Sequence, residues 1–422
     1  MVEQPIEVDV QIASHTVPAG RLWTHRHGRS ESATFSYRED YLQRADAYEL
    51  DPGLPLQAGQ HQTPVKQPLF GAMSDCAPDG WGRRLVRRAE AGRAREARTQ
   101  QRGLTEVDFL LGARDDLRQG ALRFRGHEGL EYLAVDTHGV PHLIGLPRLL
   151  NAAEEFERDE PNSEDLRLLL HGGSSLGGAR PKAHVLDSKG RLAIAKFPSP
   201  KADAWDVIRW EAVALTLAQD AGITVPDHEL HVIEKRPVLV VRRFDRHDGA
   251  RIGFVSAMTM LQAKDGGEAS YLEIGQALEE RSPDAGADLR ELWRRIVFTI
   301  LISNTDDHLR NHAFLRKSTA GWSLSPAFDL NPNPEGGATQ LATAINENDT
   351  RASITTALEV ARLFRVSEGG ARAIVADVSA ATDRWRDVAR ASGLGTQQIA
   401  RLEPAFEHEQ SAAARELSAA RS

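Results

Sequence analysis

The sequence contains a single cysteine, Cys76, among 422 residues. One thiol excludes an internal disulfide framework and a zinc site built from cysteines, and it is typical of a reducing compartment. Long apolar runs are also missing, since no stretch approaches the ~20 residues that cross a bilayer. The acidic, polar start of the chain is unlike a signal peptide. We therefore expect a cytoplasmic protein with no membrane partner.

A surplus of positive charge is absent too. The chain has 52 Lys and Arg against 60 Asp and Glu, a formal net charge of −8. This excludes a protein that coats nucleic acid or membrane with its whole surface. The local exception is a basic, helical stretch from Pro78 to Arg102, which holds eight arginines. Such a run is more often a solvated helix face than a contact surface for nucleic acid or an acidic partner.

The chain is long enough for two or three packed units. Apolar and polar residues alternate from about Val8 to Tyr37, which predicts short antiparallel strands. The acidic stretch from Asn151 to Asp165, with Pro161, predicts a linker or the start of a new unit. Further strands are expected at 183–186, 192–197 and 238–241, and helices at 205–220, at 289–300 and after residue 350. Strands first and helices afterwards predict an α+β protein with a small sheet-rich lobe and a larger helical lobe.

A candidate reactive loop runs from Asn304 to Asn311, after a predicted amphipathic helix. Asp306 and Asn311 stand in a D-x-x-x-x-N relation. Phosphoryl transfer needs a carboxylate that orients the attacking hydroxyl and, a fixed loop length away, an oxygen ligand that holds magnesium. Asp307 is one residue too close to Asn311 to fill that role. The alternative is an ordinary polar loop in which Asp and Asn cap helices.

A second carboxylate, Asp329, follows beyond a predicted hairpin turn. We place it at an apolar strand end between Phe328 and Leu330, where an isolated carboxylate is costly unless it is paired or binds a cation. Kinases have a second metal-binding aspartate at such a point. The alternative is an aspartate that caps the turn into Asn331.

A glycine-dense segment from His171 to Lys182 precedes a predicted strand. Small residues let backbone N–H groups approach phosphate oxygens, although the segment is not a P-loop motif and equally fits a flexible connection. Lys196 then lies in an apolar strand, and Glu211 in the next helix could orient it. The order of these features persuades us more than any one of them: glycine loop, strand lysine, helix glutamate, D-x-x-x-x-N loop, second aspartate.

These residues resemble the HipA family, the kinase toxins of bacterial toxin–antitoxin pairs. The resemblance covers most of the chain. The segments that carry it are Gly20-Arg21-Leu22, Glu31-Ser32-Ala33, Pro78-Asp79-Gly80-Trp81, Gly120 to Phe124, Ser175 to Lys182, Val225-Pro226-Asp227, Arg243 to Arg246, Thr305 to Asn311 and Pro326 to Asp329.

The resemblance implies a two-lobed kinase fold in which Asp306 is the catalytic base and Asn311 and Asp329 hold Mg²⁺. The implied contacts to ATP are Ser175, Leu176, Gly177, Gly178, Ala179, Lys182, Lys196, Glu211, Arg242, Phe244 and His308. Ser175, or its neighbour Ser174, is expected to be autophosphorylated, because a phosphoserine there would repel the nucleotide phosphates.

The resemblance also implies partners and boundaries. The expected substrate is a protein, an aminoacyl-tRNA synthetase, whose phosphorylation stalls translation and inhibits growth. A small HipB-like DNA-binding antitoxin would restrain the kinase, and contact with DNA would run mainly through it. The expected parts are an accessory subdomain at 1–150, a nucleotide-binding small lobe at 151–245 and a helical catalytic lobe at 246–422.

Other hypotheses stay open. A small-molecule phosphotransferase of the aminoglycoside-kinase type also has a D-x-H-x-x-N loop, which Asp306, His308 and Asn311 match, but such enzymes lack the accessory region before Asn151. An inactive kinase fold that acts only in repression is the third hypothesis. His308 and His312 have the spacing of zinc ligands on a helix, but the glutamate of H-E-x-x-H is missing.

Overall fold

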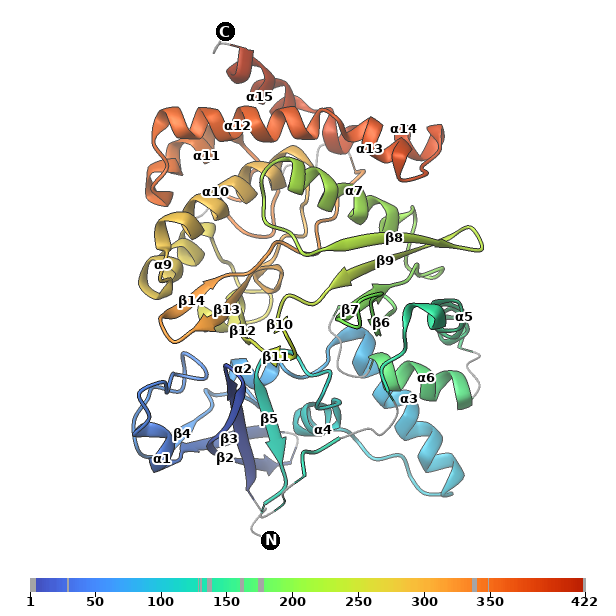
Figure 1. The fold of residues 1–422 in the computed structure, drawn as a ribbon, viewed down its shortest axis with the longest axis vertical. Helices are drawn as coiled ribbons and strands as arrows, with labels where there is room; N and C mark the ends of the chain where they lie inside the picture. The colour runs from blue at the N-terminus through green and yellow to red at the C-terminus, as the bar shows by residue number, and fades with distance from the viewer. Residues whose placement is uncertain are drawn as a thin grey trace. The chain divides into compact units, whose positions relative to one another are not determined.

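The computed structural model describes residues 5–28, 30–127, 129, 131–134, 139–159, 163–173, 178–335, 340–347 and 349–419. The chain forms two compact units (Figure 1). Unit 1 comprises residues 1–202, 240–255 and 315–319, and unit 2 comprises residues 203–239, 256–314 and 320–422. No helix in the described part of the chain is long and apolar enough to span a membrane.

Unit 1 contains most of the strands. Its elements are β1 (Ile6–Ile12), β2 (His15–His27), β3 (Ser30–Tyr37), α1 (Glu39–Leu42), β4 (His61–Gln62), α2 (Gly71–Ser74), α3 (Gly80–Glu96), α4 (Glu106–Gly112), β5 (Leu122–Arg125), a 3₁₀ turn (Leu143–Gly145), α5 (Leu146–Glu157), α6 (Ser163–Gly173), β6 (Lys182–Leu186), β7 (Leu192–Lys196), β10 (Arg246–His247) and β11 (Ala250–Arg251). Three strands run from one unit into the other along the chain: β9 (Arg236–Arg242), β12 (Gly253–Ser256) and β13 (Ala313–Ser318).

The N-terminal strands form a five-stranded sheet in the order β4-β3-β2-β1-β5. The pairs β1–β2, β2–β3 and β1–β5 are antiparallel, as the alternating sequence predicts. The register places Leu22 opposite Ile6 on one side and Phe35 on the other. Leu22 and Phe35 are fully buried, as are Val8 and Phe124 in the neighbouring strands. The apolar face of this sheet is therefore one part of the core of unit 1.

The acidic stretch from Asn151 to Asp165 is not simply a linker, as we had allowed. Its first part belongs to helix α5, and α6 begins at Ser163. The buried side chains of α5 include Leu149, Leu150 and Phe156. These apolar residues recur at helical spacing, so burial of one helix face decides the local structure despite the acidic composition.

Unit 2 is mostly helical. Its elements are α7 (Val207–Asp220), β8 (His228–Ile233), α8 (Ala257–Met260), α9 (Tyr271–Arg281), α10 (Ala285–Leu301), a 3₁₀ turn (Leu309–Asn311), β14 (Gly321–Leu324), α11 (Ile354–Val360), a 3₁₀ turn (Ala361–Phe364), α12 (Glu368–Thr382), α13 (Trp385–Ala391), α14 (Thr396–Phe406) and α15 (Glu409–Ala419). The prediction of an α+β protein with a sheet-rich N-terminal part and a mostly helical C-terminal part is confirmed.

Helix α10 is the central element of unit 2. Leu292, Trp293, Ile296 and Ile300 are completely buried at helical spacing, as the sequence periodicity predicts. The Trp293 indole donates a hydrogen bond to the Ala357 carbonyl oxygen at 2.9 Å. The C-terminal end of this rigid helix leads directly into the loop that carries Asp306.

Candidate functional site

Two lysines lie side by side at one end of the β6–β7 pair in unit 1. Lys182 begins β6 and Lys196 ends β7, and the antiparallel register places them directly opposite each other. Cross-strand neighbours point to the same face of a sheet, and like charges in this position are destabilising by themselves. The structure thus brings together two of the predicted phosphate ligands.

The glycine loop ends beside these lysines. Gly178 has a left-handed backbone (φ 76°), a conformation that favours glycine, and a Cβ built on it would meet Lys182 Nζ. Gly178 and Ala179 are exposed. The other loop residues, Ser174, Ser175, Leu176 and Gly177, lie outside the described residues, so their predicted roles stay predictions.

Helix α3 binds the end of the loop and lies close to its start. The Trp81 N–H donates to the Gly178 carbonyl oxygen at 2.8 Å, and the Trp81 indole donates to the Lys182 carbonyl oxygen at 2.8 Å. At the start of the loop, a Cβ on Gly173 would lie 3.2 Å from the indole nitrogen. Trp81 itself is completely buried. Sequence reasoning noted this tryptophan as part of a motif but did not foresee this function.

A buried charge network supports the same region of unit 1. Asp245 accepts hydrogen bonds from Arg243 Nε at 2.8 Å, from Arg246 Nη1 at 2.8 Å and from the Gly120 N–H at 2.8 Å. Burial acts to raise the pKa of Asp245, but Arg243 and Arg246 outweigh it and hold the pKa well below its usual value.

A buried histidine extends this network to the glycine loop. His184 Nδ1 donates to the Gly172 carbonyl oxygen at 2.9 Å, and its Nε2 accepts from Arg243 Nη1 at 2.8 Å. Burial and Arg243 lower the pKa of His184, so the ring is neutral. The predicted adenine-side residues Arg242 and Phe244 flank Arg243, and both are half-buried.

The D-x-x-x-x-N loop lies in unit 2, at the C-terminal end of α10. Asp306 is exposed, and Asn311 is buried. The Asn311 side-chain amide donates to the Asp306 backbone carbonyl oxygen at 3.0 Å. Because this bond uses the amide nitrogen, the side-chain oxygen of Asn311 is the atom that can bind a cation. Asp306 is thus accessible to a substrate while its backbone is held by Asn311.

Asp307 anchors the loop from inside, which the sequence did not reveal. Its carboxylate accepts from His312 Nε2 at 3.0 Å, from Thr299 Oγ1 at 3.4 Å and, through a short hydrogen bond, from the Tyr271 hydroxyl. Burial acts to raise its pKa, but His312 and Tyr271 outweigh burial and lower it. The Asp307 carbonyl oxygen also accepts from Thr343 Oγ1 at 2.6 Å.

The histidines near this loop do not form a metal site. His312 is buried against Asp307, whereas His308 is exposed. In the described ranges, no three His, Cys, Asp or Glu side chains meet in a way that could hold a metal ion. The zinc hypothesis for His308 and His312 therefore has no support. An interaction of His308 with nucleotide stays a prediction.

Asp329 differs from the prediction in one respect. Strand β14 ends at Leu324, so Asp329 does not lie at a strand end. Instead it has a left-handed backbone (φ 59°), a conformation that is uncommon for residues other than glycine and often found at functional sites. The Asn331 side-chain amide donates to its carbonyl oxygen at 3.1 Å. The backbone around Asp329 is irregular, with neither a helix nor a strand from Ser325 to Pro334.

The two predicted metal ligands belong to the same part of unit 2. A cavity of about 10 Å³, roughly one water molecule in size, is lined by Asn311 and by Phe328 and Leu330, the neighbours of Asp329. A side-chain amide oxygen and a carboxylate are the hard oxygen donors that Mg²⁺ prefers, with water completing its shell. The donor set therefore fits Mg²⁺.

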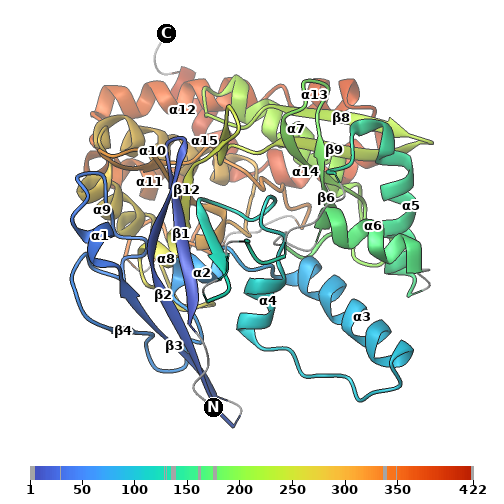
Figure 2. The same cartoon turned by 60° about the horizontal axis from the view of Figure 1, so that its bottom comes forward.

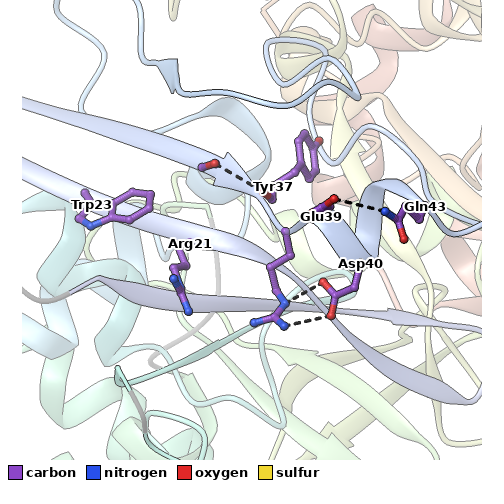
Figure 3. Close-up of a pocket in the computed structure, with 8 residues that line it drawn as sticks. Arg21, Trp23, Tyr37, Glu39, Asp40 and Gln43 are labelled. Atoms are coloured by element: carbon purple, nitrogen blue, oxygen red, sulfur yellow. Dashed lines mark hydrogen bonds and ion pairs between the residues drawn. The ribbon is translucent and has the colours of Figure 1, made fainter.

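Lys196 and Glu211 belong to different units, so the predicted ion pair between them stays a prediction. Glu211 is buried in α7. A separate, wide depression of about 710 Å³ lies on the N-terminal sheet (Figure 3). Arg38 and Asp40 pair there through two hydrogen bonds of 2.9 Å, and none of the predicted site residues lines it.

The fold and the loop together define a kinase-like α+β protein. The family model described as the HipA-like C-terminal domain matches residues 174–385, half of the chain, so the chain belongs to this family. The solved Shewanella oneidensis structure of a "Toxin Antitoxin System HipA, HipB and its operator DNA complex" matches with a TM-score of 0.65 and 14% identity, over 98% of this chain and 96% of that one. At this identity the match establishes the fold.

Two relatives carry names that refer to activity. A "Putative kinase" of Haemophilus influenzae is 25% identical over 236 residues, which make up 49% of this chain and 64% of that protein. The chain thus spans slightly less than two thirds of that relative. The "Putative kinase Y4mE" of Sinorhizobium fredii is 26% identical over 345 residues, 74% of each chain.

Proposed function

We propose that this chain is an ATP- and Mg²⁺-dependent protein kinase that phosphorylates serine or threonine. The observation that carries the proposal is that three polar residues of one loop differ in burial and in hydrogen bonding. Asp307 is buried and anchored, Asp306 is exposed, and Asn311 keeps its side-chain oxygen for a cation. Phosphoryl transfer depends mainly on positioning and electrostatics, and a rigid loop with an outward carboxylate supplies both.

In this proposal the residues have distinct tasks. Asp306 orients the substrate hydroxyl and accepts its proton, and Asn311 and Asp329 hold Mg²⁺. Lys182, Lys196 and the N–H groups near Gly178 bind the phosphates of ATP, and the backbone around Arg242 to Phe244 meets the adenine. Bound Mg²⁺ would neutralise charge on the phosphates. Ser175 or Ser174 is the site of autophosphorylation.

The biological assignment rests on the family. The protein substrate is an aminoacyl-tRNA synthetase, whose phosphorylation inhibits growth in the cytoplasm. The partner is a small HipB-like antitoxin that supplies most of the contact with DNA. The Shewanella structure supports this part of the proposal, because it is a complex of HipA, HipB and operator DNA.

The test is phosphorylation with radiolabelled ATP and Mg²⁺, read as label on the protein itself and on added synthetase. Asp306→Asn should lower the rate by about 100-fold or more, the usual contribution of a general base. It should keep the rise in thermal midpoint that Mg²⁺-ATP gives, since its phosphate and metal ligands are intact. Asn311→Ala should lose both. The matched control is Asp387→Asn on α13, an aspartate whose side chain is 77% exposed.

The competing hypotheses give different results. Turnover of a hydroxylated small molecule, with no label on any protein, would identify a small-molecule phosphotransferase. A wild-type chain that neither transfers phosphate nor gains thermal stability with Mg²⁺-ATP would identify an inactive co-repressor. Undiminished labelling in Asp306→Asn would refute the catalytic assignment.

A further inference from the structure

Helix α3 uses the arginines of its first half inside unit 1. Arg83 donates to both carboxylate oxygens of Glu106, at 2.7 and 2.5 Å, and its guanidinium lies 4.8 Å from the centre of the Phe109 ring. Arg84 forms a short ion pair with Glu157, and its guanidinium lies 5.5 Å from the Trp81 ring. These side chains hold α4 and α5 against α3, so their role is structural.

The second half of α3 is different. Between residues 87 and 102 the chain has six arginines and only two glutamates. Arg87, Arg95 and Arg98 are exposed, and the Arg87 guanidinium lies 5.2 Å from the centre of the Phe109 ring. Within the described part of the chain, neither Arg95 nor Arg98 forms an ion pair. Of the residues in the second half, Ala94 is buried. In both views the C-terminal end of α3 extends past α4 and α6 of the same unit (Figures 1 and 2).

Helix stability does not account for this charge. Cations in the last turn complement the negative end of the helix dipole, and Arg93 and Arg95 already occupy that turn. Arg98 lies beyond the helix end with a left-handed backbone (φ 51°), and Arg102 lies further along the chain. The positive charge thus continues past the point where the dipole could favour it.

The composition of the surface indicates the kind of partner. Protein interfaces are built around buried aromatic and aliphatic side chains, and the exposed positions from Arg95 to Arg102 offer none. They contain arginine, glutamate, alanine, threonine and glutamine. Arginine, threonine and glutamine donate hydrogen bonds to phosphate oxygens, and interfaces with nucleic acid are polar and strongly positive.

We propose that the second half of α3 and the residues after it, with Arg87, Arg95 and Arg98 at the centre, bind the phosphate backbone of nucleic acid. Arg87 and Arg95 are separated by about 12 Å along the helix, or three to four base-pair steps of a duplex. The contact is electrostatic and independent of base sequence. It does not depend on the proposed kinase activity, because it uses no residue of that site.

The experiment uses the full chain and fluorescence anisotropy with three labelled probes: a short duplex DNA, an RNA hairpin and a poly-aspartate peptide. Each is titrated between about 50 and 200 mM salt, the range in which phosphate contacts are most visible. The variant is Arg95→Glu/Arg98→Glu. The control is Arg372→Glu/Arg390→Glu, which changes the net charge equally at side chains that are 50% and 62% exposed on α12 and α13.

We expect salt-dependent binding of DNA or RNA by the wild-type chain and by the control. The variant should bind at least about tenfold more weakly at low salt, and the slope of log K against log salt should fall by about 2 on DNA, near 0.9 for each lost contact. The affinity of Arg95→Gln/Arg98→Gln should lie between those of the wild-type chain and the glutamate variant. This second variant controls for fraying of the helix end. Preference for one probe identifies the nucleic acid.

Several results would overturn the proposal. One is a wild-type chain that binds neither DNA nor RNA, and another is a variant whose affinity and salt slope equal those of the control. Binding of poly-aspartate as tight as that of nucleic acid, lost in the same variant, would instead assign the surface to an acidic protein.

Discussion

Asp306 and Asp307 are neighbours in sequence but differ in surroundings. Asp306 is exposed, whereas Asp307 is 3% exposed and accepts hydrogen bonds from Tyr271, Thr299 and His312. Spacing to Asn311 argues against Asp307 as the catalytic base, and this stays a prediction. The spacing did not show that Asp307 anchors the loop, because two of its partners come from separate helices.

The anchor gives a prediction about pH. Asp307→Asn should lower the free energy of unfolding at neutral pH by about 3 kcal/mol, since it removes a buried, hydrogen-bonded charge. The pKa of Asp307 is lowered in the folded chain. The unfolded chain therefore binds the proton first, and the stabilisation is lost as pH falls from about 5 through the folded pKa.

Chemical denaturation from pH 7 down to about 3 measures this effect, and the curves of wild type and variant should converge toward acid. Tyr271→Phe, which removes one donor and keeps the carboxylate, should cost about 1–2 kcal/mol. If the free energies of unfolding of wild type and Asp307→Asn changed in parallel with pH, the proposed role of the Asp307 charge would be contradicted.

At the scale of elements, periodicity predicts the N-terminal strands, strands β6, β7 and β9, and helices α7 and α10. The acidic residues from Asn151 to Asp165 predict a linker or the start of a new unit, whereas burial of Phe156 and other apolar residues of α5 makes most of the segment helical. The contact of α3 with the glycine loop was not predictable, since Trp81 and Lys182 are far apart in sequence and meet only through packing.

The packing of α3 against the glycine loop predicts what a methyl group added at Gly80 would do. A Cβ on Gly80 would lie 2.7 Å from the Gly178 carbonyl oxygen and 3.0 Å from Ala179 Cα. Gly80→Ala should therefore displace the loop end and weaken ATP binding about tenfold, within the ~1–3 kcal/mol that overpacking costs. Isothermal titration with Mg²⁺-ATP measures the change.

Gly92→Ala in the same helix is the matched control. A Cβ there meets nothing within 4 Å, and alanine should stabilise the helix by up to about 1 kcal/mol. Equal ATP affinity in the two variants would show that the approach of Gly80 to Gly178 does not position the loop.

At the scale of the whole molecule, the N-terminal region and the segment from residue 240 to 255 are one compact unit. The Arg243 guanidinium donates to the Leu117 carbonyl oxygen at 2.5 Å, and Asp245 accepts from the Gly120 N–H at 2.8 Å. A fragment of residues 151–422 would keep the Arg243–Asp245 ion pair but lose these two hydrogen bonds, at a cost of about 1.5–3 kcal/mol for each bond to a charged group.

We therefore expect the fragment to lose the cooperative thermal transition of unit 1, since whole domains are stable by only about 5–15 kcal/mol. Calorimetry of the fragment beside the full chain measures this, with Asp245→Asn in the full chain as a smaller perturbation. A fragment that unfolds at the midpoint of the full chain would mean that residues 1–150 are separable.

The sequence by itself determined the fold class, several of the strands and helices, and the candidate residues Asp306, Asn311 and Asp329, because hydrophobic periodicity and motif spacing are local properties. Tertiary structure decided which aspartate is exposed, that Lys182 faces Lys196, and that Trp81 holds the glycine loop. It also separated the arginines of α3 into half-buried and exposed sets. Burial and contacts between residues far apart in the sequence decide these points, and neither can be inferred from a short run of neighbouring residues.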